Sequence, residues 1–320
     1  ALQNSIPGSS LATPKQKWTV AGLKFENTTD AVCWSRDGKR LIVGNTFNDK
    51  AYILDAFGTS STPTIYKDQD LSIMGDGAIN GCVASGPTAD QFSIINSGIS
   101  GTQIQTWRFG QTDLPQMNYD VAEEVYLARW SPDDTMLAAV TGVLATQSGF
   151  YLWKRGEPLK AQRFLRPQRD KFLSFAIITD TVAWSPVDPH LLLVSDADQA
   201  NIWDVRKNQP LLTLAATIDN TTPVISKMSW SPNGRYIAAS YDPLGDNTKI
   251  TVKPRIFVWD VRALLKQPAQ GVQLPTLTFS SPVGSPTHNR GILDLNWSPD
   301  GRYLATSSFD NTVIIWKIDR

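Results

Sequence analysis

The sequence lacks the residue groups that would indicate catalysis or metal binding. Its 320 residues include only two histidines and two cysteines. There is no CxxC pair, no HExxH motif, no nucleophile elbow and no glycine-rich phosphate loop between a strand and a helix. Two histidines in unrelated positions and no cysteine cluster cannot supply the ligands of an ordinary transition-metal site. We therefore expect no catalytic residues, no cofactor and no metal, and the protein is predicted not to be an enzyme.

Excess charge of one sign is also missing. The 30 Lys and Arg residues balance the 30 Asp and Glu residues, which removes the long-range field typical of proteins that bind nucleic acids or anionic membranes. No apolar run approaches the ~18 residues of a membrane span. We expect a soluble domain with neither nucleic acid nor membrane as partner. Its compartment stays open: cytoplasmic, or extracellular if an upstream segment anchors it.

The two cysteines, Cys33 and Cys82, lie in apolar segments typical of buried strands. A free cysteine in such a segment behaves as a small buried hydrophobic residue. One pair in so long a chain does not make a disulfide framework. Both are predicted to be buried thiols, and the redox compartment is left open.

Residues 1–14 differ from the rest of the chain in being rich in Ser, Pro and Gln with little hydrophobic periodicity. This composition is typical of a linker or tail. We expect residues 15–320 to form a single domain, monomeric and part of a larger chain.

Repetition is the strongest signal present. Five times an apolar strand ends in Trp-Ser, and a turn then leads to a second apolar strand; these Trp-to-turn segments are residues 34–38, 130–134, 184–188, 230–234 and 297–301. Pro presets φ for a turn, Asp or Asn hydrogen-bonds its own backbone, and Gly supplies a positive φ. Each copy therefore predicts a tight antiparallel hairpin.

A third strand ending in Trp follows most of these hairpins. Trp203-Asp204 and Trp259-Asp260 are full Trp-Asp pairs, while Trp153-Lys154, Trp316-Lys317 and Leu54-Asp55 are degenerate forms. Together with the Trp-Ser-Pro-Asp-Gly hairpins, these pairs strongly resemble the WD-repeat (WD40) family over roughly residues 18–320. The resemblance implies an all-β propeller built from four-stranded blades. Sparse Gly-His pairs among the hairpins are similar to prokaryotic members of the family.

The spacing of the repeats predicts the number of blades. A degenerate sixth unit at residues 78–107 has Ala84 where the others have Trp, so the landmarks fall at 34, 84, 130, 184, 230 and 297. None of these intervals hides a complete extra blade of about 40–45 residues. We predict six blades, with seven as the alternative. The resemblance further implies that Trp18–Phe25 supplies the outermost strand of the last blade and closes the ring.

The last repeat contains the most family-like polar residues. His288 lies nine positions before Trp297, and Ser307 or Ser308, Asp310 and Trp316 follow at family-like spacing. In the family these residue types form a buried hydrogen-bond chain, so the resemblance implies a structural network of His288, Ser307, Asp310 and Trp316. A surface position or a catalytic role for His288 is the alternative. His190 lies in a turn and is expected to be solvated.

Two long connections are candidate partner-binding loops. Residues 163–175 combine Arg166, Arg169 and Lys171 with Phe172 and Phe175, and aromatic residues and Arg are enriched at interface hot spots. Alternatively, the phenylalanines belong to the core and the charges to a solvated rim. The other insertion, residues 241–254, begins at Tyr241. Arg166, Arg169, Lys171, Phe172 and Tyr241 are the predicted partner-contacting residues.

These observations predict a non-catalytic scaffold or recognition domain that binds a protein or peptide partner through its loop faces. The fold alone does not specify function, so this prediction follows from the family resemblance. The first alternative is a sensor that binds a small molecule or carbohydrate at the channel mouth. The second is a hydrolytic propeller with dispersed carboxylates.

Overall fold

The computed structural model describes most of the chain between residues 31 and 318. The described ranges are 31–35, 37–44, 50–55, 64–67, 78–84, 90–98, 101–123, 125–141, 149–159, 161–165, 181–196, 199–207, 209–216, 224–242, 254–266, 272–273, 275–279 and 288–318. The predicted closing strand Trp18–Phe25 therefore lies outside the described residues.

Within these ranges the strands form six sheets that follow one another along the chain. The first three sheets contain β1 (Ala31–Trp34), β2 (Arg40–Gly44), β3 (Lys50–Asp55) and β4 (Thr64–Lys67); β5 (Ala78–Ala84), β6 (Gln91–Gly98), β7 (Gly101–Arg108) and β8 (Met117–Val121); and β9 (Val125–Trp130), β10 (Met136–Thr141), β11 (Gly149–Lys154) and β12 (Gln162–Leu165). Each of these three sheets is an antiparallel meander.

The next three sheets repeat the pattern with variations. They contain β13 (Val182–Trp184), β14 (Leu191–Asp196), β15 (Gln199–Asp204), β16 (Pro210–Ala215) and β20 (Val272–Gln273); β17 (Val224–Trp230), β18 (Tyr236–Asp242), β19 (Arg255–Asp260) and β21 (Leu277–Phe279); and β22 (Ile292–Trp297), β23 (Tyr303–Ser308) and β24 (Val313–Lys317). A short helix, α1 (Val261–Leu264), follows β19. After α1, β20 pairs in parallel with β16 and so ties the fifth unit to the edge of the fourth.

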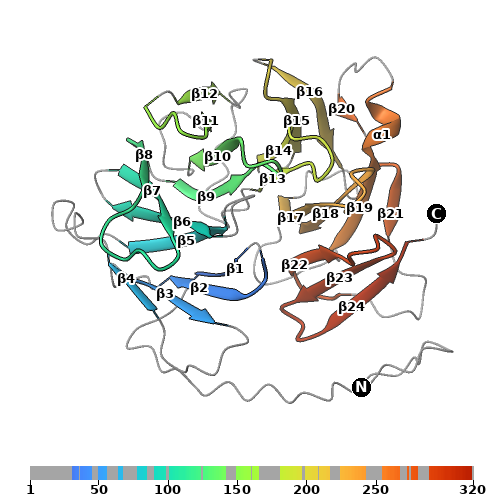
Figure 1. The fold of residues 1–320 in the computed structure, drawn as a ribbon. Coiled ribbons are helices and arrows are strands. Elements are labelled where there is room, and N and C mark those ends of the chain that lie inside the picture. The colour runs from blue at the N-terminus through green and yellow to red at the C-terminus, as the bar shows by residue number, and fades with distance from the viewer. Residues whose placement is uncertain are drawn as a thin grey trace.

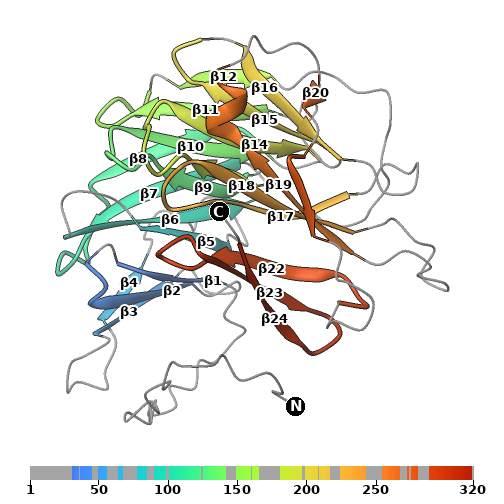
Figure 2. The same ribbon diagram turned by 90° about the vertical axis from the view of Figure 1, so that its right-hand side faces the viewer.

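The sheets are arranged around a common centre, with the first strand of each nearest to it (Figure 1). The view from the side in Figure 2 shows the sheets fanning out from these inner strands. Consecutive inner strands lie against each other's sheets, from β1 and β5 to β17 and β22. This is the all-β, WD40-type propeller arrangement, and we call each sheet a blade, numbered one to six in chain order.

The turns after the inner strands of blades one, three, five and six form as their residue types predict. In blade five the Ser231 hydroxyl donates to Asn233 Oδ1 at 2.7 Å and accepts the Tyr236 N–H at 2.8 Å. The turns that begin at Ser35, Ser131 and Ser298 repeat this pair of bonds, with an Asp in place of Asn233. Gly234 has a φ of +66°, and a Cβ there would approach Val187 Cγ2 to 2.3 Å, so glycine is required both for the turn and for the contact with blade four.

The tryptophans at the ends of the inner strands join neighbouring blades by hydrogen bonds. In three cases the indole N–H of one blade donates to a backbone carbonyl of the preceding blade. The acceptor is the residue just before that blade's own inner-strand tryptophan. The bonds run from Trp184 to Arg129 at 2.9 Å, from Trp230 to Ala183 at 3.1 Å, and from Trp297 to Ser229 at 3.1 Å. In blade two Ala84 replaces the tryptophan, and the indole of Trp130 donates instead to Ser93 Oγ at 3.0 Å. The recurring Trp therefore sets the spacing between blades as well as filling the core.

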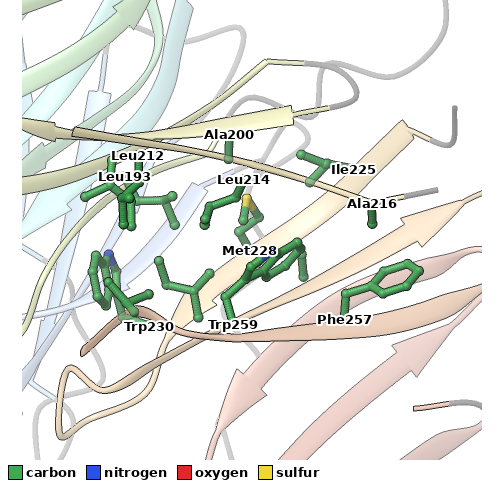
Figure 3. Packing of buried hydrophobic residues seen from close by; sticks show 14 of the residues in the cluster. Leu193, Ala200, Leu212, Leu214, Ala216, Ile225, Met228, Trp230, Phe257 and Trp259 are labelled. Atoms are coloured by element: carbon green, nitrogen blue, oxygen red, sulfur yellow. The ribbon is translucent and has the colours of Figure 1, made fainter. Parts of the chain in front are cut away.

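The core consists of apolar layers between successive blades. The largest layer among the described residues lies between blades four and five, where Leu193 and Leu212 face Trp230, and Phe257 lies at the other end of the layer, near Ala216 (Figure 3). Trp259 is fully buried, and its indole N–H donates to the Gln273 carbonyl at 3.1 Å. Such layers hold each blade rigidly against the next and leave only the loops at the blade ends free to vary.

Cys33 corrects one expectation from the sequence. It is half-buried in β1 and is disulfide-bonded, not a free buried thiol. The described residues include no free cysteine. The other cysteine of the sequence, Cys82, is in β5, which lies beside β1. The two positions are far apart in sequence, and only the packing of adjacent inner strands brings them close together.

Candidate functional site

Four of the five predicted partner-contacting residues lie outside the described residues. Arg166, Arg169, Lys171 and Phe172 follow the end of β12, and the described chain resumes at Thr181. Their assignment to a binding loop stays a prediction.

Tyr241 is the fifth, and the structure places it in the core. Its side chain is 0% exposed and packs edge-on against Phe257, with ring centroids 5.1 Å apart. Burial raises the pKa of its phenol far above the usual range. Tyr241 lies in β18 on the same side as Ile237 and Ala239, which are also buried between blades four and five. The prediction that Tyr241 contacts a partner is therefore wrong in this structure, because its strand position directs it inward.

A polar network in blade six brings His288, Asp310 and Trp316 together. His288 is buried, with Nδ1 3.2 Å from Asp310 Oδ2 and Nε2 2.8 Å from Thr306 Oγ1. The Trp316 indole donates to the same Thr306 oxygen at 2.9 Å. With its proton on Nδ1, His288 satisfies every contact: Trp316 donates to Thr306, Thr306 donates to His288, and His288 donates to Asp310.

The hydroxyl in this network is Thr306, which corrects the choice of Ser307. Side chains alternate across a strand, and in β23 Leu304, Thr306 and Ser308 are buried while Ser307 is only half-buried. Ser308 is also outside the relay, because its Oγ donates to the Arg290 carbonyl at 2.9 Å. The family spacing predicts His288, Asp310 and Trp316. The hydroxyl between them is Thr306, because Thr306 and not Ser307 is on the buried face of β23.

The other blades lack a hydroxyl at the position of Thr306. Thr306 lies two residues after Leu304, which is the partner of Trp316 in the strand pairing. In each of blades two to five, the matching position is found by taking the residue paired with the third-strand tryptophan and moving two residues onward. These positions are occupied by Ile94, Ala139, Val194 and Ala239. Accordingly the buried indole nitrogens of Trp153 and Trp203 have no hydrogen-bond partner among the described residues. These blades rely on apolar packing.

Asp310 anchors the network to the loop that precedes β22. It accepts hydrogen bonds from the Thr312 hydroxyl at 2.6 Å and from the Asn289 N–H at 3.0 Å. Desolvation raises the pKa of Asp310, but the bonds from Thr312, Asn289 and His288 outweigh it and hold the pKa well below its usual range. A carboxylate held in this way fixes the geometry of the blade and is poorly suited to accept a proton.

We expect this carboxylate to give the protein an acid-sensitive share of its stability. A lowered folded-state pKa stabilises the fold above the unfolded pKa of about 3.9 and loses that contribution as the pH falls through the folded value. Asp310→Asn removes the titrating group, so the stability gap between the parent and this variant should be full at pH 6 and shrink progressively below about pH 4. Urea unfolding from pH 6 to 3 measures the gap; a gap independent of pH would contradict this role.

A second polar site lies where α1 meets the turn of blade five. Here a pocket of about 410 Å³ is lined by Arg235, Asp260, Arg262, Ala263 and Lys266. Asp260 pairs with Arg235, whose Nε lies 2.9 Å from Oδ2, and caps α1 by accepting the Ala263 N–H at 3.0 Å. Arg262 and Lys266 remain exposed. The pocket is thus a basic, open surface made by loops at one end of the blade.

Among the described residues there is no group of three or more His, Cys, Asp or Glu side chains that could hold a metal ion. In the same part of the chain, no helix is long and apolar enough to cross a membrane.

Comparison with known proteins identifies the repeats. The family model "WD domain, G-beta repeat" matches residues 208–248 and 280–317, in the region of blades five and six. A solved structure described as "Crystal Structure of Mitotic Checkpoint Complex" superposes with a TM-score of 0.64 at 18% identity, covering 94% of this chain and 80% of that chain. At this identity the likeness establishes the fold alone.

Curated relatives match shorter parts of the chain. "Chromatin assembly factor 1 subunit FAS2 homolog" from Oryza sativa subsp. japonica is 27% identical over 42% of this chain and 24% of its own length. "Protein LST8 homolog" from Drosophila melanogaster is 31% identical over 37% of this chain and 31% of its own length. The chain thus spans less than a third of either relative. Both relatives are eukaryotic, and the predicted prokaryotic origin has no support from them.

Proposed function

We propose that this chain, which carries WD repeats on a β-propeller fold, is a non-catalytic scaffold that binds a protein or peptide partner through its loop faces. The observation that carries the proposal is the contrast between rigid, repeated blades and variable connections. The names of similar proteins point the same way, since one is a subunit of an assembly factor and another comes from a checkpoint complex. We extend that role to this chain as part of the proposal, with residues 15–320 as one domain.

We propose further that the propeller has six blades and closes between blades six and one. Val313 and Ile315 in β24 are 69% and 63% exposed, whereas residues at the matching positions of blades four and five are fully buried. Leu293 in β22 is 43% exposed. A packed neighbour on this face would bury all three side chains, and blade one is the neighbour that a ring requires. Residues 18–25 would then supply the fourth strand beside β24.

The recurring tryptophan bond specifies how this closure would look. Trp34 is 48% exposed, unlike its counterparts Trp130, Trp184 and Trp230, which are buried. By the pattern of the other blades, its indole N–H would donate to the carbonyl of Asn296, the residue before Trp297. This bond would bring the first and last inner strands together and complete the ring.

The scaffold proposal is tested by charge reversal on two loop faces. Partners captured by the full chain are identified by mass spectrometry and purified, and the dissociation constant of the purified pair is then measured. We expect Arg166→Glu with Arg169→Glu to weaken binding at least about tenfold, because truncating or reversing a hot-spot residue costs more than 1–2 kcal/mol. The melting temperature should not change, since the charges are predicted to be solvated.

A matched variant on the basic pocket serves as the control for position. Arg262→Glu with Lys266→Glu makes the same charge change on another loop, and its binding should equal that of the parent. If it weakens binding while the first variant does not, the partner-contacting face is the pocket beside α1 and the loop prediction is wrong. Equal binding by both variants, or no stable partner for the full chain, would overturn the binding proposal for these faces.

A further inference from the structure

The inner strands contain few charged residues, and one of them differs from the others in its surroundings. In β1, β5, β9, β13, β17 and β22 the charged residues are Arg129, Lys227 and Asp294. Arg129 is exposed although its neighbours Ala128 and Trp130 are buried between blades. Side chains alternate along a strand, so Arg129 lies on the face of β9 opposite Ala128 and Trp130, the face toward blade four. Because β9 is the inner strand of its blade (Figure 1), this exposed side chain lies near the centre of the ring.

Arg129 has no ion pair among the described residues. Nη1 of its guanidinium donates to the Ala128 carbonyl at 2.8 Å, and this is its one hydrogen bond in that part of the chain. A guanidinium carries five N–H donors, so most of them have no protein acceptor. Desolvation lowers the pKa of Arg129, which means that the surrounding protein already removes part of its water. A cation in such a place is stabilised by an anion that it can bind.

The positions that match Arg129 on the other inner strands offer no competing acid. The residues matching Arg129, one before each landmark, are Cys33, Val83, Ala183, Ser229 and Asn296, and none carries a carboxylate. Ala183, on the next inner strand, has a short side chain. The Arg129 backbone is itself held in place, because its carbonyl accepts the Trp184 indole at 2.9 Å.

The one acid of the inner strands is already engaged. Asp294 accepts the Leu295 N–H at 2.9 Å and the Asn296 side-chain amide at 2.9 Å. Lys227 in β17 is exposed and, like Arg129, has no ion pair among the described residues. The inner strands therefore carry two exposed cations without an ion pair among the described residues and one carboxylate that is occupied locally. Channels lined by one sign of charge raise the local concentration of the opposite ion.

We propose that the central channel binds an oxyanion, a carboxylate or phosphate group, on the guanidinium of Arg129. The planar fork of N–H donors matches the two oxygens of such a group. Lys227 adds attraction at longer range, and its single ammonium cannot supply the same geometry. The oxyanion is either a free small anion or an acidic side chain that a protein partner inserts into the channel. The first source needs no protein partner, so this inference goes beyond the scaffold role.

Thermal melts of the full chain with two probes distinguish these sources. The probes are inorganic phosphate, titrated against chloride at constant ionic strength, and a hexaglutamate peptide. We expect a saturable rise in melting temperature, with Arg129→Gln weakening the apparent affinity about tenfold or more. Arg129→Lys should retain part of the response. Arg302→Gln, at an exposed arginine in the turn of blade six, should respond like the parent.

Each outcome bears on the proposal. Saturation by phosphate identifies a site for a free oxyanion, and saturation by hexaglutamate alone identifies a site for an acidic peptide side chain. If Arg129→Gln responds to both probes as the parent does, or if the parent responds to neither, the channel site is refuted. Should Arg129→Gln fail to fold, the Arg129→Lys variant and the shift of the Arg129 side-chain Nε signal on adding phosphate to the parent decide the question. The loop variants that test the scaffold proposal leave Arg129 intact, so the two proposals fail independently.

Discussion

A variant lacking residues 1–25 should melt at least about 10 °C below the full chain, because a strand that buries several large apolar side chains contributes roughly 1.5–3 kcal/mol for each of them. Trp18, Val20, Leu23 and Phe25 are the large apolar residues of the predicted strand within the deleted segment. Their loss would also leave β24 as an unpaired edge beside the exposed Val313 and Ile315. Unpaired apolar edges associate with one another, so the variant should form oligomers.

A shorter deletion provides the matched control. Removing residues 1–14 takes away the linker-like tail and keeps the predicted strand, so its melting temperature and oligomeric state should equal those of the full chain. Calorimetry and size-exclusion chromatography with light scattering measure both properties. If the two deletions behave alike, residues 15–25 do not close the ring, and the exposed face of blade six needs another explanation.

Thr306→Val should be the most damaging single substitution in blade six. The change removes the oxygen that accepts the Trp316 indole and the hydroxyl that reaches His288, and it leaves the buried His288 and the half-buried Trp316 without these bonds. An unsatisfied buried polar group costs about 1–3 kcal/mol, so the free energy of unfolding should fall by roughly 2–5 kcal/mol for the two groups. Valine itself fits, since Val194 occupies the matching position in blade four.

Ser307→Ala separates the network from its neighbour in sequence. Ser307 is half-buried and faces the other side of β23, so its loss should cost less than about 0.5 kcal/mol. Urea unfolding of both variants makes the comparison. A cost for Ser307→Ala equal to that of Thr306→Val would mean that the buried relay does not run through Thr306.

The hairpins were predictable because their chemistry is local. Ser, Asp and Gly within five residues determine the turn, and the observed bonds at Ser231 and its counterparts follow from those residue types alone. The pairing of β20 with β16 was not predictable, because a two-residue strand after α1 carries no periodic signal of its own. Blade architecture was therefore readable from sequence, whereas the exchange of an edge strand between blades required the structure.

Strand phase explains the two corrected side chains. Ile237, Ala239 and Tyr241 alternate along β18, and this period of two was already a signal that Tyr241 points into the core. The same period of two, counted forward from Leu304, would have selected Thr306 over Ser307. Arg129 had a weaker signal: it is one of few charges in the inner strands, but a charge in a strand becomes informative only after the fold shows which strands surround the centre.

The polar network of blade six has a consequence for the order in which the molecule assembles. During synthesis the N-terminal parts of a chain emerge first, so blade one is complete while its neighbour in the proposed ring is still being made. The network draws only on residues between His288 and Trp316, all belonging to the last blade and its preceding loop. The network can thus order the three described strands of the last blade by itself, so that residues 18–25 and blade one meet a preformed sheet. The blade that is made last therefore has its own polar network to hold its sheet in shape until the N-terminal segment completes it.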